Sequence, residues 1–156
     1  MECHDGRPSE LPSTVLYAVL RLRVDVFVVE QECPYPELDG RDLSADCHWW
    51  WVSEGDRVLA TLRLVDEPRA VDGSGSAGRI GRVATAVVAR GRGLAGQLMD
   101  RAMAEGVARG HRRVVLDAQS AMADWYGRRG FVASGPEFLE DGIPHLPMVR
   151  ALTDGA

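Results

Sequence analysis

The stretch Arg90-Gly91-Arg92-Gly93-Leu94-Ala95 joins a predicted strand, Arg79 to Thr85, to a predicted helix, Leu94 to Arg109. A strand that enters a helix through a glycine turn leaves backbone N–H groups without partners, and the helix dipole adds partial positive charge there. The turn is lined by residues that leave room or add charge: Arg90, Gly91, Arg92, Gly93 and Gly96. These features predict a site for a pyrophosphate.

Two other nucleotide-binding motifs fit the turn less well. A P-loop needs Gly-Lys-Ser/Thr, which is absent. The spacing Gly91-x-Gly93-x-x-Gly96 satisfies the bare dinucleotide fingerprint, but the acidic residue expected about 20 positions on is Asp117, which lies somewhat further along. A chain that begins with a helix and a hairpin also argues against the strand order of a Rossmann fold.

The regions on either side of the turn alternate between strand and helix patterns. Strands are predicted at 48–52, 57–65, 79–85, 113–119, 131–134 and 145–152. Helices are predicted from Ser13 to about Glu30, at 94–109 and at 121–129. This order predicts an α/β fold with a mixed sheet, and no linker divides residues 1–156, so one domain is expected.

Four segments have features beyond their predicted secondary structure. In the first helix, Leu16, Leu20, Val24 and Phe27 form the apolar stripe, and Arg21, Arg23 and Asp25 lie off it. Residues 33–42 predict a long acidic, aromatic loop of the kind that binds ligands, and residues 72–76 a surface loop. Trp49-Trp50-Trp51 predicts strand packing on both faces.

The bulk composition limits the partners. Hydrophobic residues make up 46% of the chain and charged residues 26%, and a net charge of −5 argues against nucleic acid. No apolar run reaches the ~18 residues of a membrane span, and no signal peptide begins the sequence. Cys3, Cys33 and Cys47 form no CxxC pair, so free thiols, no metal and a cytoplasmic location are expected.

The glycine turn and several other blocks resemble one enzyme family. Arg90-x-x-Gly93-x-Ala95 after a strand is similar to the acetyl-CoA signature of the GNAT superfamily of N-acetyltransferases. Residues 116–119 followed by 123–131, a strand and then an aromatic-Tyr helix ending in Gly-Phe, resemble the second motif of that family. The blocks at 26–31, 33–35, 38–40, 80–83 and 140–145 resemble the ElaA-type branch.

The resemblance implies a GNAT fold, with a mostly antiparallel central sheet flanked by helices and a V-shaped opening between two parallel strands. Acetyl-CoA would be the cosubstrate, with its pantetheine on the backbone of Val83, Ala84 and Thr85. The pyrophosphate would sit on the turn. The residues that the resemblance assigns to the cofactor are Val83, Ala84, Thr85, Arg90, Gly91, Arg92, Gly93, Leu94, Ala95, Gly96 and Gln119. Tyr126 would protonate the departing thiolate.

The chain departs from the commoner family pattern at the general base. Residues 80–85 contain no carboxylate, which leaves Glu30, Glu37 and His145 as unranked candidates for the base. Acidic segments lie at 37–42 and 140–141, and we expect Glu37, Asp39 and His145 to bind the acceptor. These segments predict a negatively charged entrance to the acceptor site, here called the negative mouth, that attracts a cationic amine. Arg82 either neutralises buried carboxylates or touches the substrate.

The leading prediction is therefore an enzyme that moves acetyl from acetyl-CoA to a small-molecule or side-chain amine. Two alternatives stay open: a CoA-binding regulatory module without catalysis, and an acyltransferase similar to acyl-homoserine-lactone synthases. The sequence does not identify the acceptor, and a homodimer stays open.

Overall fold

The computed structural model describes residues 1–68 and 75–152, so the predicted loop at 72–76 falls mostly outside the described ranges. The strands are β1 (Glu2–Gly6), β2 (His48–Glu54), β3 (Arg57–Glu67), β4 (Ala77–Thr85), β5 (Arg113–Gln119), β6 (Val132–Ala133), β7 (Phe138–Glu140) and β8 (Ile143–Ala151). The α-helices are α1 (Ser13–Val24), α2 (Leu94–Ala108) and α3 (Ala123–Gly127). A π-helical segment, Asp25–Glu30, continues α1, and short 3₁₀ turns occupy Pro8–Glu10, Val87–Ala89 and Ser120–Met122.

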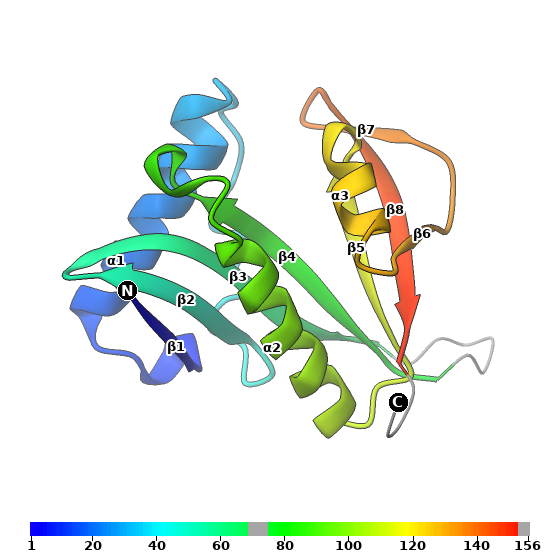
Figure 1. Ribbon diagram of the computed structural model, residues 1–156, viewed down its shortest axis with the longest axis horizontal. Coiled ribbons are helices and arrows are strands. Elements are labelled where there is room, and N and C mark those ends of the chain that lie inside the picture. Colours follow the sequence, from blue (N-terminus) through cyan, green and yellow to red (C-terminus); the bar gives the residue numbers. More distant parts are fainter. Residues whose placement is uncertain (69–74, 153–156) are drawn as a thin grey trace. The chain divides into compact units, whose positions relative to one another are not determined.

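The strands hydrogen-bond in the order β1-β2-β3-β4-β5-β8-β6, with β7 also paired to β8 (Figure 1). β1 pairs antiparallel with β2, and β2 with β3. β8 pairs antiparallel with β5, β6 and β7, whereas β4 and β5 run parallel. A mixed, mostly antiparallel sheet with helices is therefore confirmed.

Two compact units make up the chain: Met1–Val65 with Arg82–Ala102, and Asp66–Gly81 with Met103–Ala156. In the first unit, Val19 and Leu22 of α1 pack with Trp49 and Trp51 of β2 in one apolar cluster. All three tryptophans of β2 are buried, as predicted. In the second unit, β5 contributes Val114, Leu116 and Ala118 to the core, together with Phe131 and Met148.

The predicted apolar face of the first helix is partly wrong. Its buried residues are Val19, Leu22, Arg23 and Val26, whereas Val24 is exposed. Arg23, predicted to lie off the stripe, is only 1% exposed. A buried arginine needs partners for its charge, and carboxylates of the loop that follows supply them. The helix begins at Ser13 as predicted, and Pro12 precedes it as the cap.

Candidate functional site

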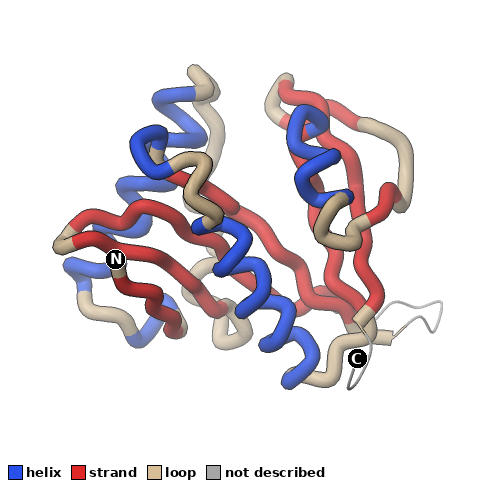
Figure 2. Tube along the Cα trace, in the orientation of Figure 1, coloured by secondary structure: helices blue, strands red, loops and turns tan. Residues whose placement is uncertain are grey.

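The glycine turn connects β4 to α2 as predicted (Figure 2). Gly91 and Gly93 have φ values of 80° and 74°, in the left-handed region that favours glycine. A Cβ added at either residue would meet no atom within 4 Å. Glycine is therefore needed here for the backbone conformation, and the surface of the turn stays open to a ligand. The first N–H groups of α2, from Leu94 onward, lie next to it.

The two arginines of the turn differ in their partners. Arg90 donates Nη1 and Nη2 to the two carboxylate oxygens of Glu30, at 2.8 and 2.7 Å, and its Nε to the Thr85 carbonyl at 3.1 Å. Arg92 donates to the Val88 carbonyl at 3.2 Å. Within residues 1–68 and 75–152, no carboxylate pairs with Arg92. Its positive charge is thus the less compensated of the two.

The pair with Arg90 bears on the role of Glu30 as a candidate base. The hydrogen bonds from Arg90 lower the pKa of the Glu30 carboxyl below its ordinary value. A carboxylate with a lowered pKa is a weaker base near neutral pH. The structure therefore favours Glu30 as the ionic partner of Arg90.

The three residues expected to contact pantetheine, Val83, Ala84 and Thr85, lie at the C-terminal end of β4. Ala84 is buried, and Val83 and Thr85 are half-buried. The parallel ladder between β4 and β5 consists of three residue pairs, from Ala77 opposite Arg113 to Arg79 opposite Val115. The V-shaped opening and the contacts with pantetheine stay predictions.

The acidic loop at 33–42 is neutralised by arginines from three elements. Glu37, only 4% exposed, accepts hydrogen bonds from Arg23 Nε at 2.7 Å and from Arg82 Nε at 2.6 Å. Asp42 accepts from Arg23 Nη1 at 2.7 Å and from Arg63 Nη1 at 3.2 Å. We call these five residues, with Asp39, the arginine–carboxylate cluster.

Asp39 completes the cluster. Its carboxylate accepts from both terminal nitrogens of Arg63, at 3.0 and 2.5 Å, and from Arg82 Nη2 at 3.4 Å. Burial by itself would raise the pKa of Asp39, but the hydrogen bonds from Arg63 and from the Arg41 amide outweigh it and hold the pKa well below its usual value. Three carboxylates thus face three arginines.

The predicted negative mouth is therefore wrong for this loop, because Arg23, Arg63 and Arg82 balance its carboxylates. Arg41 is the only arginine within the loop sequence itself, whereas these three arginines come from distant parts of the chain. Arg82 neutralises a buried carboxylate, which was one of its two predicted roles. A function of Glu37 and Asp39 in acceptor binding stays a prediction.

Tyr126 lies on α3 in the second unit. It is 8% exposed and packs edge-on against Trp125 and Phe131, with ring centroids 5.0 and 6.0 Å away. Burial raises the pKa of the phenol to about 12, so Tyr126 is protonated throughout the neutral range. No described residue donates to or accepts from its hydroxyl, which leaves the O–H available to a ligand.

His145 and Gln119 lie opposite each other on β8 and β5. Directly paired residues on adjacent strands share a face of the sheet. His145 Nδ1 lies 2.7 Å from the Ile143 carbonyl, which assigns a proton to Nδ1 and leaves Nε2 with its lone pair in the neutral ring. Nε2 lies 3.8 Å from the Glu140 carboxylate, and the ring stacks on Phe138. The geometry suits a base at Nε2.

The remaining expectations concern thiols, metals and membranes. Cys3, Cys33 and Cys47 form no disulfide bond, and burial raises the pKa of the Cys47 thiol to about 12. The described part of the chain holds no group of three potential metal ligands. No helix in that part is both long and apolar enough to cross a membrane.

The fold agrees with comparisons to known proteins. Residues 29–152 match the acetyltransferase (GNAT) domain family. A UPF0039 protein of Mycobacterium tuberculosis is 47% identical over 142 residues, which cover 90% of this chain and 87% of that protein. Protein ElaA of Escherichia coli is 35% identical over 153 residues, 96% of each chain.

Solved structures agree with this match. The crystal structure of Escherichia coli ElaA has a TM-score of 0.86, at 34% identity, with 96% of this chain and 99% of that one covered. An acyl-CoA N-acyltransferase from Pseudomonas aeruginosa has a TM-score of 0.84, at 41% identity, with 97% and 100% covered. A CoA-dependent acyl-homoserine lactone synthase, at 21% identity and a TM-score of 0.72, shares the fold alone, over 97% of this chain and 83% of its own. The chain belongs to the GNAT acetyltransferase family and is an acyltransferase that uses a CoA cosubstrate.

Proposed function

We propose that the chain transfers acetyl from acetyl-CoA to a primary amine, either a small molecule or an amine-bearing side chain, by direct attack on the thioester. The observation that carries this proposal is the open turn with two left-handed glycines, which brings the N-terminus of α2 to the surface next to Arg92. Backbone amides at a helix N-terminus, a helix dipole and an arginine are the features that bind a pyrophosphate. The donor is proposed as acetyl because the matching family is described by that activity.

The reaction needs two proton movements. The neutral amine attacks the thioester carbon, the C–S bond breaks, and the ammonium proton passes to a base while the thiolate receives a hydrogen bond or a proton. Tyr126 is proposed to act on the sulfur. With its pKa raised to about 12, the phenol is a weaker acid than a thiol of pKa about 8.5. Tyr126 therefore stabilises the thiolate chiefly by donating a hydrogen bond.

His145 is the proposed base. Its Nδ1 is oriented by the Ile143 carbonyl, so Nε2 accepts the proton, and the nearby Glu140 carboxylate stabilises the imidazolium. Of the three candidates, Glu30 and Glu37 have their carboxylates engaged by arginines at 2.6–2.8 Å. Gln119, opposite His145, is proposed to contact the cofactor.

The test is thiol release from acetyl-CoA, propionyl-CoA and longer acyl-CoAs against a panel of amines, amino acids and lysine peptides. Amine-dependent release that is fastest with acetyl-CoA supports the proposal. His145→Gln should lower kcat least at the acidic end of the pH profile, where the base of the parent is itself protonated, and most where the parent's base is unprotonated. Binding of CoA without release by any amine would indicate a regulatory module, and preference for a long acyl chain would favour the synthase-like alternative.

A further inference from the structure

Arg82 has an unusual backbone conformation for a strand residue. Among the described residues, three that are not glycine have positive φ, and Arg82 alone of these lies inside a strand, with φ 51° in β4. Glu32 and Asp141 lie in turns. A side chain with a Cβ disfavours this conformation, so it persists only where surrounding contacts hold it.

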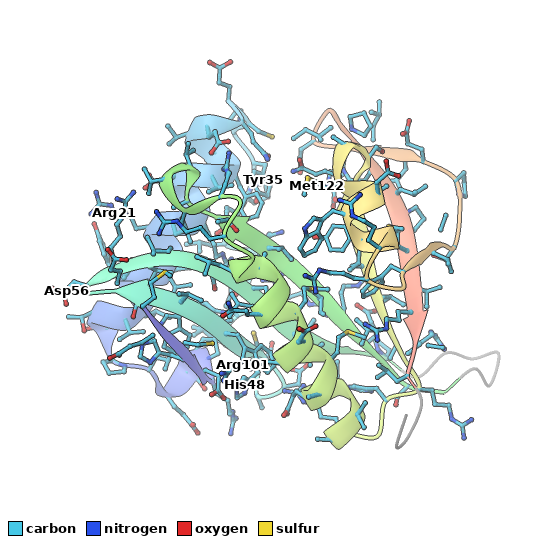
Figure 3. All side chains as sticks on the ribbon, in the orientation of Figure 1. Arg21, Tyr35, His48, Asp56, Arg101 and Met122 are labelled. Carbon is cyan, nitrogen blue, oxygen red and sulfur yellow. The ribbon has the colours of Figure 1, made fainter. Side chains whose placement is uncertain are left out.

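The contacts that hold Arg82 come from the loop at 33–42. Its Nε donates to the Glu37 carboxylate at 2.6 Å, and its Nη2 donates to the Glu37 backbone carbonyl at 3.0 Å. The guanidinium also lies over the ring of Tyr35, 5.4 Å from the centroid (Tyr35 is labelled in Figure 3). Arg82 is thus bound to Glu37 through both the side chain and the main chain of that residue.

Glu37 is itself fixed. Arg23, which is 1% exposed, donates to both of its carboxylate oxygens, at 2.7 and 2.8 Å. Arg23 also binds Asp42, so the loop is attached to α1 at two points. The partner that holds Arg82 therefore cannot readily move, and we call the Arg82–Glu37 contact the β4 clamp.

The clamp lies immediately before Val83-Ala84-Thr85, the backbone proposed to receive pantetheine. Rotation about φ at one strand residue turns the chain that follows it, so the N–H and C=O groups of the next residues point in different directions. We propose that Arg82 is a positioning residue for acyl-CoA, which acts through the β4 clamp by holding the backbone of residues 83–85 in the orientation that pairs with the cofactor.

This inference rests on the proposed cofactor site, and it gives Glu37 a role other than binding the acceptor. The loop at 33–42 becomes the support of the cofactor strand. Substitution of the loop should then change the use of acyl-CoA even where no acceptor is present.

A glycine substitution separates positioning from direct contact. Arg82→Gly removes the side chain but tolerates φ 51°, whereas Arg82→Ala removes the same contacts and disfavours that φ. Both variants leave Glu37 with Arg23 as its remaining arginine, so the loss of the ion pair is common to the two. Arg82→Asn, which tolerates the left-handed region better than alanine, is the intermediate case.

CoA affinity is measured by calorimetry and KM for acetyl-CoA by thiol release, with melting temperatures as the folding control. We expect affinity in the order Gly, Asn, Ala, with Arg82→Ala weaker than Arg82→Gly by up to about 30-fold, which corresponds to the ~2 kcal/mol upper cost of a Cβ in the left-handed region. Equal losses in the three variants, or no loss in any, would overturn the positioning role. If Arg82→Ala does not fold, the Asn–Gly comparison decides in the same way. Failure of the parent to bind CoA would contradict the proposed function instead.

Discussion

Gly93→Ala tests the pyrophosphate site with a single added methyl group. The left-handed φ of 74° costs an alanine about 1–2 kcal/mol relative to glycine. The new Cβ meets no protein atom within 4 Å, so the unliganded protein loses stability through the backbone alone. In a protein of this size, that loss lowers the melting temperature by about 2–8 °C.

Cofactor binding should suffer a second, separate loss. A charge-assisted hydrogen bond contributes about 1.5–3 kcal/mol, and each 1.4 kcal/mol is about tenfold in affinity. A methyl group that displaces the pyrophosphate from one amide of the turn should therefore weaken CoA binding by roughly 10- to 150-fold. Calorimetry with CoA measures this directly.

Gly55→Ala is the matched control. Gly55 has φ 59°, is equally open at its Cβ, and lies in the β2–β3 turn next to Asp56, which is labelled in Figure 3. Gly55→Ala should lose similar stability and keep the CoA affinity of the parent. S-acetylpantetheine lacks the pyrophosphate, so Gly93→Ala and the parent should use it equally well. The reasoning is refuted if Gly93→Ala binds CoA as the parent does, or if Gly55→Ala weakens CoA binding to the same extent.

Three further changes test other parts of the site. Tyr126→Phe should lower kcat by about 100-fold or more with little change in CoA affinity. A variant that releases thiol with the kcat of the parent would show that Tyr126 has no part in the mechanism. Glu30→Gln frees Arg90 and should keep kcat while CoA binds as tightly or more tightly in calorimetry, whereas a loss of ~100-fold in kcat would restore Glu30 as the base. Because the pKa of Asp39 is depressed in the folded state, its contribution to stability is present above the unfolded pKa of about 3.9 and is lost as pH falls through the folded value. Urea unfolding should therefore show the parent losing stability below about pH 4 more steeply than Asp39→Asn, and identical pH profiles would contradict the Arg63–Asp39 pairing.

The sequence predicted those features that depend on local pattern. The glycine turn, the start of α2 at Leu94 and the bounds of β5 are in place because glycine, helix periodicity and a short apolar run each act over a few residues. β7 was missed, since Phe138–Glu140 is a three-residue strand that exists only through its pairing with β8. Its Asp141-Gly142 turn has two positive φ values, as such hairpins require.

The arginine–carboxylate cluster could not be read from periodicity. Arg63 alternates with Leu62 and Leu64, a pattern that predicts a polar, solvent-facing side of the strand, yet it is 5% exposed. Thr61, on the same predicted polar face, is 2% exposed. The buried charge of Arg63 is compensated by carboxylates 21 and 24 residues away in the chain, and such distant pairings leave no local pattern. The sequence does contain one signal of the cluster. Arg23 lies among apolar residues of the first helix, and an acidic loop follows that helix.

The central claim, transfer of acetyl from acetyl-CoA to an amine, is tested most directly with acetyl-CoA that carries an isotopic label in its acetyl group. The parent protein is incubated with this donor and with the best amine of the acceptor panel, and thiol release and labelled products are measured together by mass spectrometry. The account predicts one labelled N-acetyl amine for each thiol released, and no labelled protein when the amine is omitted. Thiol release without a labelled amine, or a labelled acyl-protein that forms before the product, would contradict it.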